Sequence, residues 1–322
     1  MTDHLEDIPV RDDLQTIAFY NLENLFDIHN DKHTNDNDFS PTSAKKWTPK
    51  RYDNKLRKLG FAVSNIGKKE TGKHPAIIGL AEVENAKVIE DLIASKYLEN
   101  CNYGYVHYDS LDERGIDVAL LYDTNAFEVI YSETFIVHLT KDNGETDYTR
   151  DILLVSGLLD GEHIHVIANH WSSRREGEKE TEHKRFAAAD KVIEIITNLN
   201  IEHTNPKIVV IGDFNDDPTS SSIKKLVISQ DLFNPMEVLH TYSRGTTTYN
   251  FKWNLFDQII FSTNFFEATP DTLSFDKANI FDDDFLKLLK GKYKGKPFRT
   301  YVGPKYKGGY SDHFPVYAVF KK

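Results

Sequence analysis

The sequence is poor in cysteine, in long apolar runs and in net positive charge. A single cysteine, Cys101, excludes an internal disulfide and any zinc site built from several cysteines. No apolar run approaches the roughly 18 residues that span a bilayer, and residues 1–13 lack the basic start and apolar stretch of a secretory signal. The formal net charge of -11 excludes coating of nucleic acid by the whole surface, although it permits a local basic groove. We therefore expect a soluble cytoplasmic protein without stable membrane insertion.

Segments rich in Val, Ile, Phe and Tyr, bounded by turn residues, predict the strands. They cover residues 15–24, 75–85, 116–123, 127–139, 151–171, 206–216, 256–262 and 314–320. Asp160-Gly161 lies between two such runs and is a strong hairpin signal. Several neighbouring strands are therefore expected to be antiparallel.

Amphipathic helices are predicted between the strands. Apolar residues recur at helical spacing over residues 56–66 and again over 186–196, and residues 87–95 are a shorter candidate. Mixed strands with hairpins and helices favour two packed sheets covered by helices over a purely parallel sheet. No repeat, Pro-rich linker or shift of composition marks a second domain, so we expect a flexible arm over residues 1–14 and a single domain over residues 15–322.

Polar residues gather where the predicted strands end or begin. The run VVIGDFNDDP ends a strand in three aspartates, and similar polar groups occur at residues 21–24, 82–85, 169–173, 257–258 and 311–313. Any one of them is most simply a turn, because Asn and Asp are common there. Together they would crowd carboxylates, amides and two histidines at one edge, where like-charged carboxylates raise one another's pKa. A cation between them would resolve that conflict.

The residue types at these ends favour a hard divalent ion. Carboxylate and amide oxygens suit Mg²⁺ or Mn²⁺, whereas zinc would recruit His and Cys in close spacing. Two histidines beside such an ion indicate hydrolysis, with one acting on water and the other on a departing oxygen. Phosphate esters are the substrates that this chemistry suits best.

The motifs AEVEN, NHW, GDFN, FDQII and SDHFPV, in this order, resemble those of the endonuclease/exonuclease/phosphatase superfamily. The resemblance runs from about Gln15 to Phe320. It implies an α/β (α+β) fold of the deoxyribonuclease-I-like type, a four-layer sandwich of two mixed β-sheets flanked by helices. It also implies a metal-dependent phosphoric ester hydrolase.

The resemblance assigns a metal site and a phosphate site by position. Glu82 matches the metal-binding glutamate of the family, and Asn21 matches the amide near the metal and the scissile phosphate. Asp312 matches a carboxylate close to the metal. The implied cofactor is Mg²⁺ or Mn²⁺, and one or two ions are both possible.

The resemblance also assigns the catalytic residues. Asp213 and Asn215 match the pair that orients the nucleophile and binds phosphate. His313 matches the catalytic histidine, and Asp257 matches the carboxylate that orients it. His170 matches the second histidine of the deoxyribonuclease-like and sphingomyelinase-like branches, which the abasic-site branch lacks.

Five further residues are weaker candidates. Glu113 would orient the second histidine, as a glutamate does in the deoxyribonuclease-like branch, or would form a surface ion pair. Arg114, Arg174 and Arg299 would contact phosphate, since a guanidinium fork suits its oxygens. Trp171 would stack on a base or sugar, or would pack beneath the histidine loop. The basic, Tyr-containing segment 287–309 is either solvated surface or a contact for a phosphate chain.

These assignments predict a phosphodiesterase or nuclease that hydrolyses nucleic acid or nucleotide-like diesters by in-line attack of water. A lipid phosphodiesterase or an inositol-type phosphomonoesterase is the alternative, because one fold hosts several phosphoesterases. A scaffold that has lost its chemistry fits less well, since the metal carboxylate and both histidines are present. No protein partner is indicated, and we expect a monomer.

Overall fold

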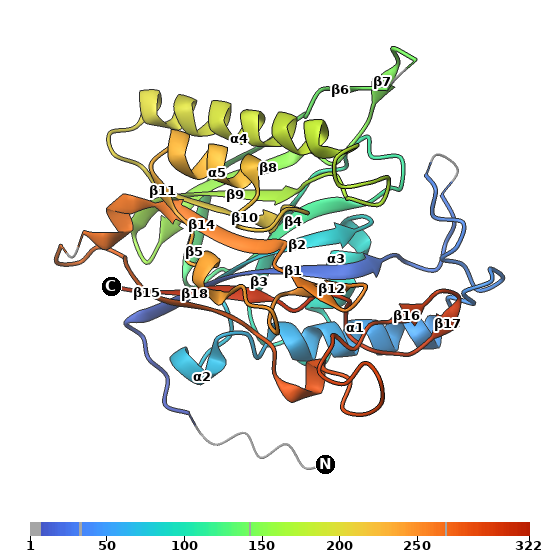
Figure 1. Cartoon of the computed structure of the whole chain (residues 1–322). Helices are drawn as coiled ribbons and strands as arrows, with labels where there is room; N and C mark the ends of the chain where they lie inside the picture. The colour runs from blue at the N-terminus through green and yellow to red at the C-terminus, as the bar shows by residue number, and fades with distance from the viewer. Residues whose placement is uncertain (1–7, 32–33, 142, 268) are drawn as a thin grey trace.

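Two six-stranded sheets lie face to face at the centre of the molecule (Figure 1). This computed structural model describes residues 8–31, 34–141, 143–267 and 269–322. Part of the arm expected over residues 1–14, residues 1–7, lies outside the described residues.

The first sheet holds both ends of the described chain. Its strand order is β15 (Ser274–Ile280), β18 (Val316–Lys321), β1 (Leu14–Leu25), β2 (Ile77–Val83), β4 (Asp117–Asp123) and β3 (Tyr103–His107). Strands β1 and β2 are parallel and the other neighbours are antiparallel, so the sheet is mixed.

The second sheet is built mainly from the middle of the chain. Its order is β11 (Leu232–Phe233), β14 (Asp257–Ser262), β10 (Lys207–Asp213), β9 (Glu162–His170), β8 (Ile152–Leu159) and β5 (Phe127–Phe135). Only β9 and β10 are parallel in it. At the turn between β8 and β9, Asp160 and Gly161 have φ of 49° and 84°, as a tight hairpin requires.

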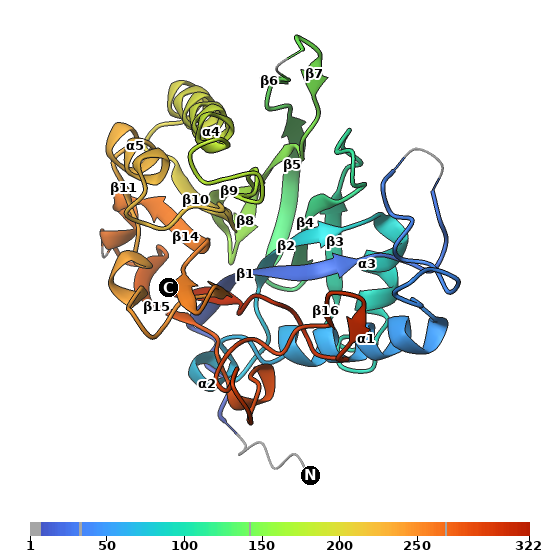
Figure 2. The ribbon, with the colours of Figure 1, turned by 45° about the vertical axis from the view of Figure 1, so that its right-hand side comes forward.

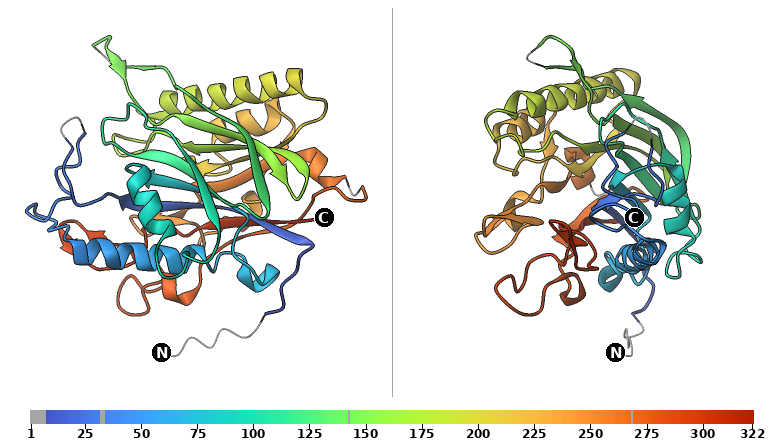
Figure 3. Two further views of the ribbon diagram at one scale, coloured as in Figure 1. Left: turned by 180° about the vertical axis from the view of Figure 1, so that it is seen from behind. Right: turned by 90° about the vertical axis from the view of Figure 1, so that its right-hand side faces the viewer.

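Helices cover the outer face of each sheet. Helices α1 (Pro49–Val63), α2 (Lys68–Thr71) and α3 (Ala86–Ile93) lie beside the first sheet, and α4 (Glu182–Glu202) and α5 (Ser221–Ser229) lie on the second (Figures 1 and 3). Pro49 starts α1, and the Asn85 side chain caps α3 by accepting a hydrogen bond from Val88 N at 3.0 Å. The predicted four layers, with two mixed sheets inside, are confirmed.

Small elements decorate the edges. Hairpin β6 (Leu139–Thr140) and β7 (Thr146–Asp147) projects beyond β5 (Figure 2). The other small elements are the pairs β12 (Thr247–Tyr249) with β13 (Lys252–Asn254) and β16 (Tyr301–Val302) with β17 (Lys305–Tyr306), and the 3-10 turns Glu237–Leu239, Thr263–Phe266 and Asp284–Leu286. Within the described ranges, no helix has the length and apolarity needed to cross a membrane.

Among the described helices and strands of five or more residues, three are absent from the sequence prediction. Strands β3 and β15 lie at the edges of the first sheet, where many of their side chains are half-buried or exposed, so they show little apolar patterning. Helix α5 buries only Ser222, Ile223 and Leu226. The strand expected over 127–139 ends earlier, at Phe135.

A glycine on β2 allows close contact between the two sheets. A Cβ added to Gly79 on β2 would lie 2.7 Å from Ile211 Cδ1 on β10 and 2.9 Å from Phe19 Cδ2.

We therefore expect Gly79→Ala to lower the free energy of unfolding by about 1–3 kcal/mol, measured by urea denaturation. In an Ile211→Val background, which lacks that Cδ1, the same change should cost less. An equal cost in both backgrounds would contradict this account of the sheet contact.

Candidate active site

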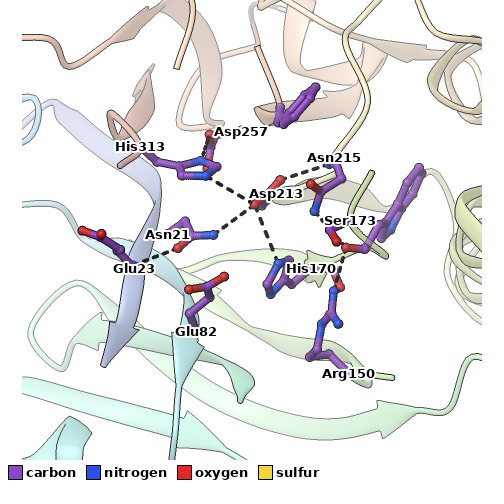
Figure 4. A network of polar contacts seen from close by, with 12 residues as sticks. Asn21, Glu23, Glu82, Arg150, His170, Ser173, Asp213, Asn215, Asp257 and His313 are labelled. Atoms are coloured by element: carbon purple, nitrogen blue, oxygen red, sulfur yellow. Dashed lines mark hydrogen bonds and ion pairs between the residues drawn. The ribbon is translucent and has the colours of Figure 1, made fainter. Parts of the chain in front are cut away.

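The polar strand ends converge between the two sheets (Figure 4). Asn21 comes from the end of β1, and His170 and Asp213 come from the ends of the parallel strands β9 and β10. Asp257 starts β14, and His313 precedes β18. The structure thus brings together five residues that are far apart in the sequence.

Asp213 lies at the centre of this group. Its Oδ2 accepts a hydrogen bond from Asn21 Nδ2 at 3.0 Å and lies 3.7 Å from His170 Nε2 and 4.0 Å from His313 Nε2. Its Oδ1 accepts a hydrogen bond from the backbone N–H of Asn215 at 3.0 Å. The Asp213 carboxylate therefore links the two sheets and faces both histidines.

His313 is held from behind by a buried carboxylate. Its Nδ1 donates to Asp257 Oδ2 at 2.7 Å, which leaves Nε2 turned toward Asp213. Asp257 is 0% exposed, and its other oxygen has no hydrogen-bond partner among the described residues. Ser311 fixes the loop by accepting from His313 N at 3.1 Å and donating to Asn21 O at 2.6 Å.

The second histidine is positioned through its backbone. Arg150 donates to the carbonyl oxygens of His170 at 3.2 Å and Trp171 at 2.7 Å, and it pairs with Asp112 at 3.1 Å. Asn215 Nδ2 donates to the same Trp171 oxygen at 2.9 Å. These bonds hold the segment after β9 against the end of β10.

The electrostatics of the two histidines are opposite. Burial, with Arg150 nearby, lowers the pKa of His170 well below its ordinary value. Burial also disfavours the protonated ring of His313, but attraction by Asp257 and its hydrogen bond outweigh this and raise the pKa of His313 well above the ordinary value. Burial, with repulsion from Asp257, raises the pKa of Asp213 to about 7. The site therefore favours a neutral His170 and a protonated His313 when no cation is bound.

Irregular backbone aims several site residues. Glu23, Asn24 and Glu82 have φ of 51°, 56° and 62°, and Asn215 has φ of 49°, all in the left-handed region. The pairing of β1 with β2 shifts register between Asn21 and Leu25, and a matching irregularity in β2 includes Glu82. Bulges of this kind bend a strand and redirect its side chains. In a regular strand, consecutive side chains point to opposite faces of the sheet. The irregular backbone here redirects some of these polar side chains toward the site.

The oxygen-rich ends of β1 and β2 fit a hard divalent ion. Glu82 keeps one carboxylate oxygen 3.7 Å from Arg114 Nη1, while its other oxygen accepts from Asn24 N at 2.8 Å. Burial, with repulsion from neighbouring carboxylates, raises the pKa of Asp213 and of Glu23, and a cation nearby would favour their ionised forms. Glu82 and Asn21 would hold such an ion.

A further group could also bind a cation. Ligand atoms of Asp213, Asp257 and His313 lie within 4.8 Å of one another. Asp312 instead turns its carboxylate to Arg299, with Nη2 at 2.6 Å. The arrangement of these residues is therefore compatible with one bound ion or with two.

A buried ion pair beside the site has no counterpart in the sequence prediction. Lys55 on α1 is buried, with Nζ 4.0 Å from Glu23 Oε2 and 2.6 Å from Thr300 Oγ1. Burial, with repulsion from Asp312, raises the pKa of Glu23 to about 7, and burial lowers the pKa of Lys55 to about 8. Glu23 also accepts from Tyr301 N at 3.3 Å, so the pair ties the segment around residue 300 to β1. Amphipathic spacing on α1 predicts a buried face but not a buried lysine.

For two of the weaker candidates, the structure shows the alternative contact, packing for Trp171 and a surface ion pair for Glu113. Trp171 is 2% exposed, packs edge-on against Phe214 and donates Nε1 to Asn169 Oδ1 at 3.1 Å, so its ring is not available to stack on substrate. Glu113 is exposed and pairs with Lys141 at 2.5 Å, so it does not orient His170. The neighbouring Asp112 acts on that loop instead, through Arg150.

The three arginines differ in availability. Arg174 is bound to Asp216 at 2.6 Å and donates to Asn215 O at 2.7 Å, so it supports the backbone of Asn215. Arg114 lies beside Glu82. Arg299 lies between Glu23, at 3.5 Å, and Asp312. Arg114 and Arg299 thus lie beside carboxylates of the predicted metal site.

Family comparison agrees with this arrangement. The sequence model of the Endonuclease/Exonuclease/phosphatase family matches residues 16–322. The chain belongs to this family. Its fold is therefore that of an endonuclease/exonuclease/phosphatase domain. No curated protein sequence matched the chain.

Solved structures with the same fold cover nearly the whole chain. A family protein from Bacteroides thetaiotaomicron is 18% identical, with a TM-score of 0.60 and 95% of this chain and 94% of that chain covered. A mannosyl-6-phosphatase from the same species is 18% identical, with a TM-score of 0.59 and coverage of 96% and 100%. TDP2 from D. rerio, solved with a single strand DNA product, is 12% identical, with a TM-score of 0.59 and coverage of 97% and 100%. At these identities the likeness shows the fold alone.

The charge on Asp257 should control the titration of His313. We expect Asp257→Asn to lower the pKa of His313, measured by NMR of the ring C–H, because it removes the attraction that overcomes burial. The raised folded pKa stabilises the fold fully below the unfolded value of about 6.5, and this is lost as pH rises through the folded pKa. The stability difference between the two proteins should therefore be largest at low pH. An unchanged His313 pKa would contradict the pairing.

Proposed function

We propose that this family member is a Mg²⁺- or Mn²⁺-dependent phosphoesterase, and most directly a phosphodiesterase for nucleic acid or a nucleotide-like substrate. One observation carries the proposal. A buried aspartate, Asp213, lies within 4.0 Å of two histidines, and one of them is backed by a second buried aspartate. A histidine backed by a buried carboxylate is suited to accept a proton from the water that attacks phosphorus, and a second histidine is suited to act on the departing oxygen.

The residues divide into roles by their contacts. His313, supported by Asp257, takes the proton from the attacking water, and Asp257 stabilises the imidazolium that forms. Asp213 and Asn215 orient the water and the phosphate. His170 lies on the other side of Asp213 and contacts the phosphoryl oxygens or the leaving group. A bound divalent ion at Glu82 and Asn21 would neutralise charge on the phosphoryl oxygens.

An exposed aromatic pair supports the nucleic-acid substrate. Phe251 and Tyr293 stack with ring centroids 5.5 Å apart and an interplanar angle of 11°, and both are exposed. Lys292 and Lys296 lie over the Phe251 ring at 4.9 and 4.1 Å. Aromatic faces with cations suit bases and a phosphate chain. We infer from this pair that the basic segment 287–309 contacts the phosphate chain of the substrate.

A small phosphomonoester is the second candidate substrate. A cavity of about 440 Å³ opens beside Glu23 and is lined by Lys45, Arg175 and Arg299. Glu23 and Asp38 also line it and offset part of this charge, and the remaining positive charge in a cavity of that size would suit a single phosphate group on a small molecule. One solved structure of this fold is also a phosphatase.

Hydrolysis of two chromogenic esters separates the candidates. With Mg²⁺ or Mn²⁺, we expect cleavage of bis(p-nitrophenyl) phosphate in preference to p-nitrophenyl phosphate, and loss of that cleavage in EDTA. His313→Ala should lower kcat by about 10²–10⁴-fold, the usual contribution of a general base. Circular dichroism would check that the variant is folded.

A matched control is available at the opposite end of the first sheet. His74 also pairs with an aspartate, Asp123, at 3.0 Å, just before β2 begins. His74→Gln should leave kcat unchanged. Faster cleavage of the monoester would favour the phosphatase, and equal activity of wild type and His313→Ala would contradict the assigned role.

The pH dependence of hydrolysis distinguishes base from acid. If His313 is the general base, kcat/KM should rise with pH through its raised pKa, because only the neutral ring accepts a proton. In Asp257→Asn this rise should move to lower pH, with a lower plateau. A rate that instead falls with pH through the same group would make His313 the general acid and exchange its role with that of His170.

A further inference from the structure

Three histidine rings meet at the far end of β9 from the active site. His163 and His165 alternate along β9 and so lie on one face of the sheet, and His203 follows the last residue of α4. The ring centroids are 4.6 Å apart for His163 and His165, 4.7 Å for His165 and His203, and 5.3 Å for His163 and His203. One ring nitrogen from each lies within 4.8 Å of the others.

The central ring is oriented by a buried hydroxyl. His165 is 1% exposed, and its Nδ1 lies 2.7 Å from Ser156 Oγ on the paired strand β8. This bond leaves Nε2 of the ring free to act as a ligand. A hydrogen bond on the second ring nitrogen is the usual support for a histidine that binds a metal.

The charge state of the cluster suits a ligand role. Burial, with His163 and His203 nearby, lowers the pKa of His165 to about 4, and burial lowers that of His163. The nearest carboxylate on the strand, Glu162, is neutralised by Lys207 at 2.7 Å. Neutral imidazoles are the form that binds metal.

The cluster opens into a polar cavity of about 420 Å³. Lys207 and the acidic residues Glu162 and Glu267 also line it, beside the three histidines, but no carboxylate oxygen of the described residues belongs to the group of ligand atoms that lie within 4.8 Å of one another. The space is large enough for water to complete a tetrahedral shell. A Zn²⁺ ion with bonds of about 2.0–2.1 Å would draw the three nitrogens to about 3.4 Å from one another, so the rings would turn inward when the ion binds.

We propose that His163, His165 and His203 form a binding site for a late first-row divalent metal ion such as Zn²⁺, separate from the phosphoesterase site. Three imidazole nitrogens without a carboxylate suit Zn²⁺, Cu²⁺ or Ni²⁺, and they disfavour Mg²⁺. The active site offers mainly oxygen, which favours Mg²⁺. The two ends of β9 therefore select different metals.

The expected consequence is structural. His170 is five positions after His165 on the strand, so the histidine cluster lies about 16 Å along the strand from the proposed catalytic group. An ion bound there would join the end of α4 to β9, and through Ser156 to β8. It would stabilise the folded state by mass action and supply no chemistry at phosphorus.

Metal binding in excess Mg²⁺ tests the proposal without any activity assay. The metal-free protein is titrated with Co²⁺ in excess Mg²⁺, and we expect the visible absorption of Co²⁺ in a tetrahedral site with nitrogen ligands. Added Zn²⁺ should then displace the Co²⁺ and remove this absorption. After dialysis against Zn²⁺ and Mg²⁺, elemental analysis should find one Zn²⁺ per chain. Zn²⁺ should also raise Tm of the wild type.

Variants assign the site to the cluster. The double variant His163→Gln, His203→Gln should bind Zn²⁺ more than about 100-fold more weakly and lose the Tm shift, while Ser156→Ala should weaken binding by about 10–100-fold. His183→Gln, an exposed histidine at the start of the same helix, is the matched control and should bind as the wild type does. Tm in EDTA checks that each variant is folded.

Two results would overturn the site. One is the absence of Zn²⁺ binding by the wild type in excess Mg²⁺. The other is a double variant that binds Zn²⁺ as tightly as the wild type. Neither result depends on whether the protein hydrolyses phosphate esters.

Discussion

A carboxylate buried between two sheets is the constraint on which this structure depends. Asp213 is 2% exposed, and burial raises its pKa to about 7, so its ionised form requires compensation. Asn21 provides part of it across the sheet interface, from 192 residues away in sequence. The two sheets must therefore stack so that β1 and β10 end at the same place. The close contact of Gly79 with Ile211 is part of that stacking.

The residues around Asp213 are held by partners that do no chemistry in the proposed mechanism. Arg150 fixes the backbone after β9, Arg174 fixes the carbonyl of Asn215, and Lys55 with Glu23 holds the segment that carries Arg299. Removing one partner of a buried pair leaves an unpaired charge, which is strongly destabilising. The irregular backbone at Glu82 and Asn215 persists because such contacts over-determine it.

The two ends of strand β9 lie beside different kinds of side chain. Its last residue, His170, lies near carboxylates and amides. Near its first residue, His163 and His165 contact a third histidine, His203, after the end of α4. The strand is buried along most of its length, and its two ends contact different side chains, so a substitution at one end leaves the contacts of the other in place. Stability and catalysis can therefore be examined separately in this chain.

Sequence alone determined the buried strands, the main helices and the set of polar strand ends, because burial imposes periodic patterns and turns demand particular residues, whereas the half-buried edge strands β3 and β15 lack such a pattern. It also placed the metal and catalytic candidates through ordered motifs, from Asn21 to His313. Only the tertiary structure decided which side chains meet. It buried Trp171, turned Glu113 to Lys141, placed Lys55 beneath Glu23 and brought His203 to His165. These contacts join residues distant in sequence, and no local pattern encodes a partner that the fold supplies.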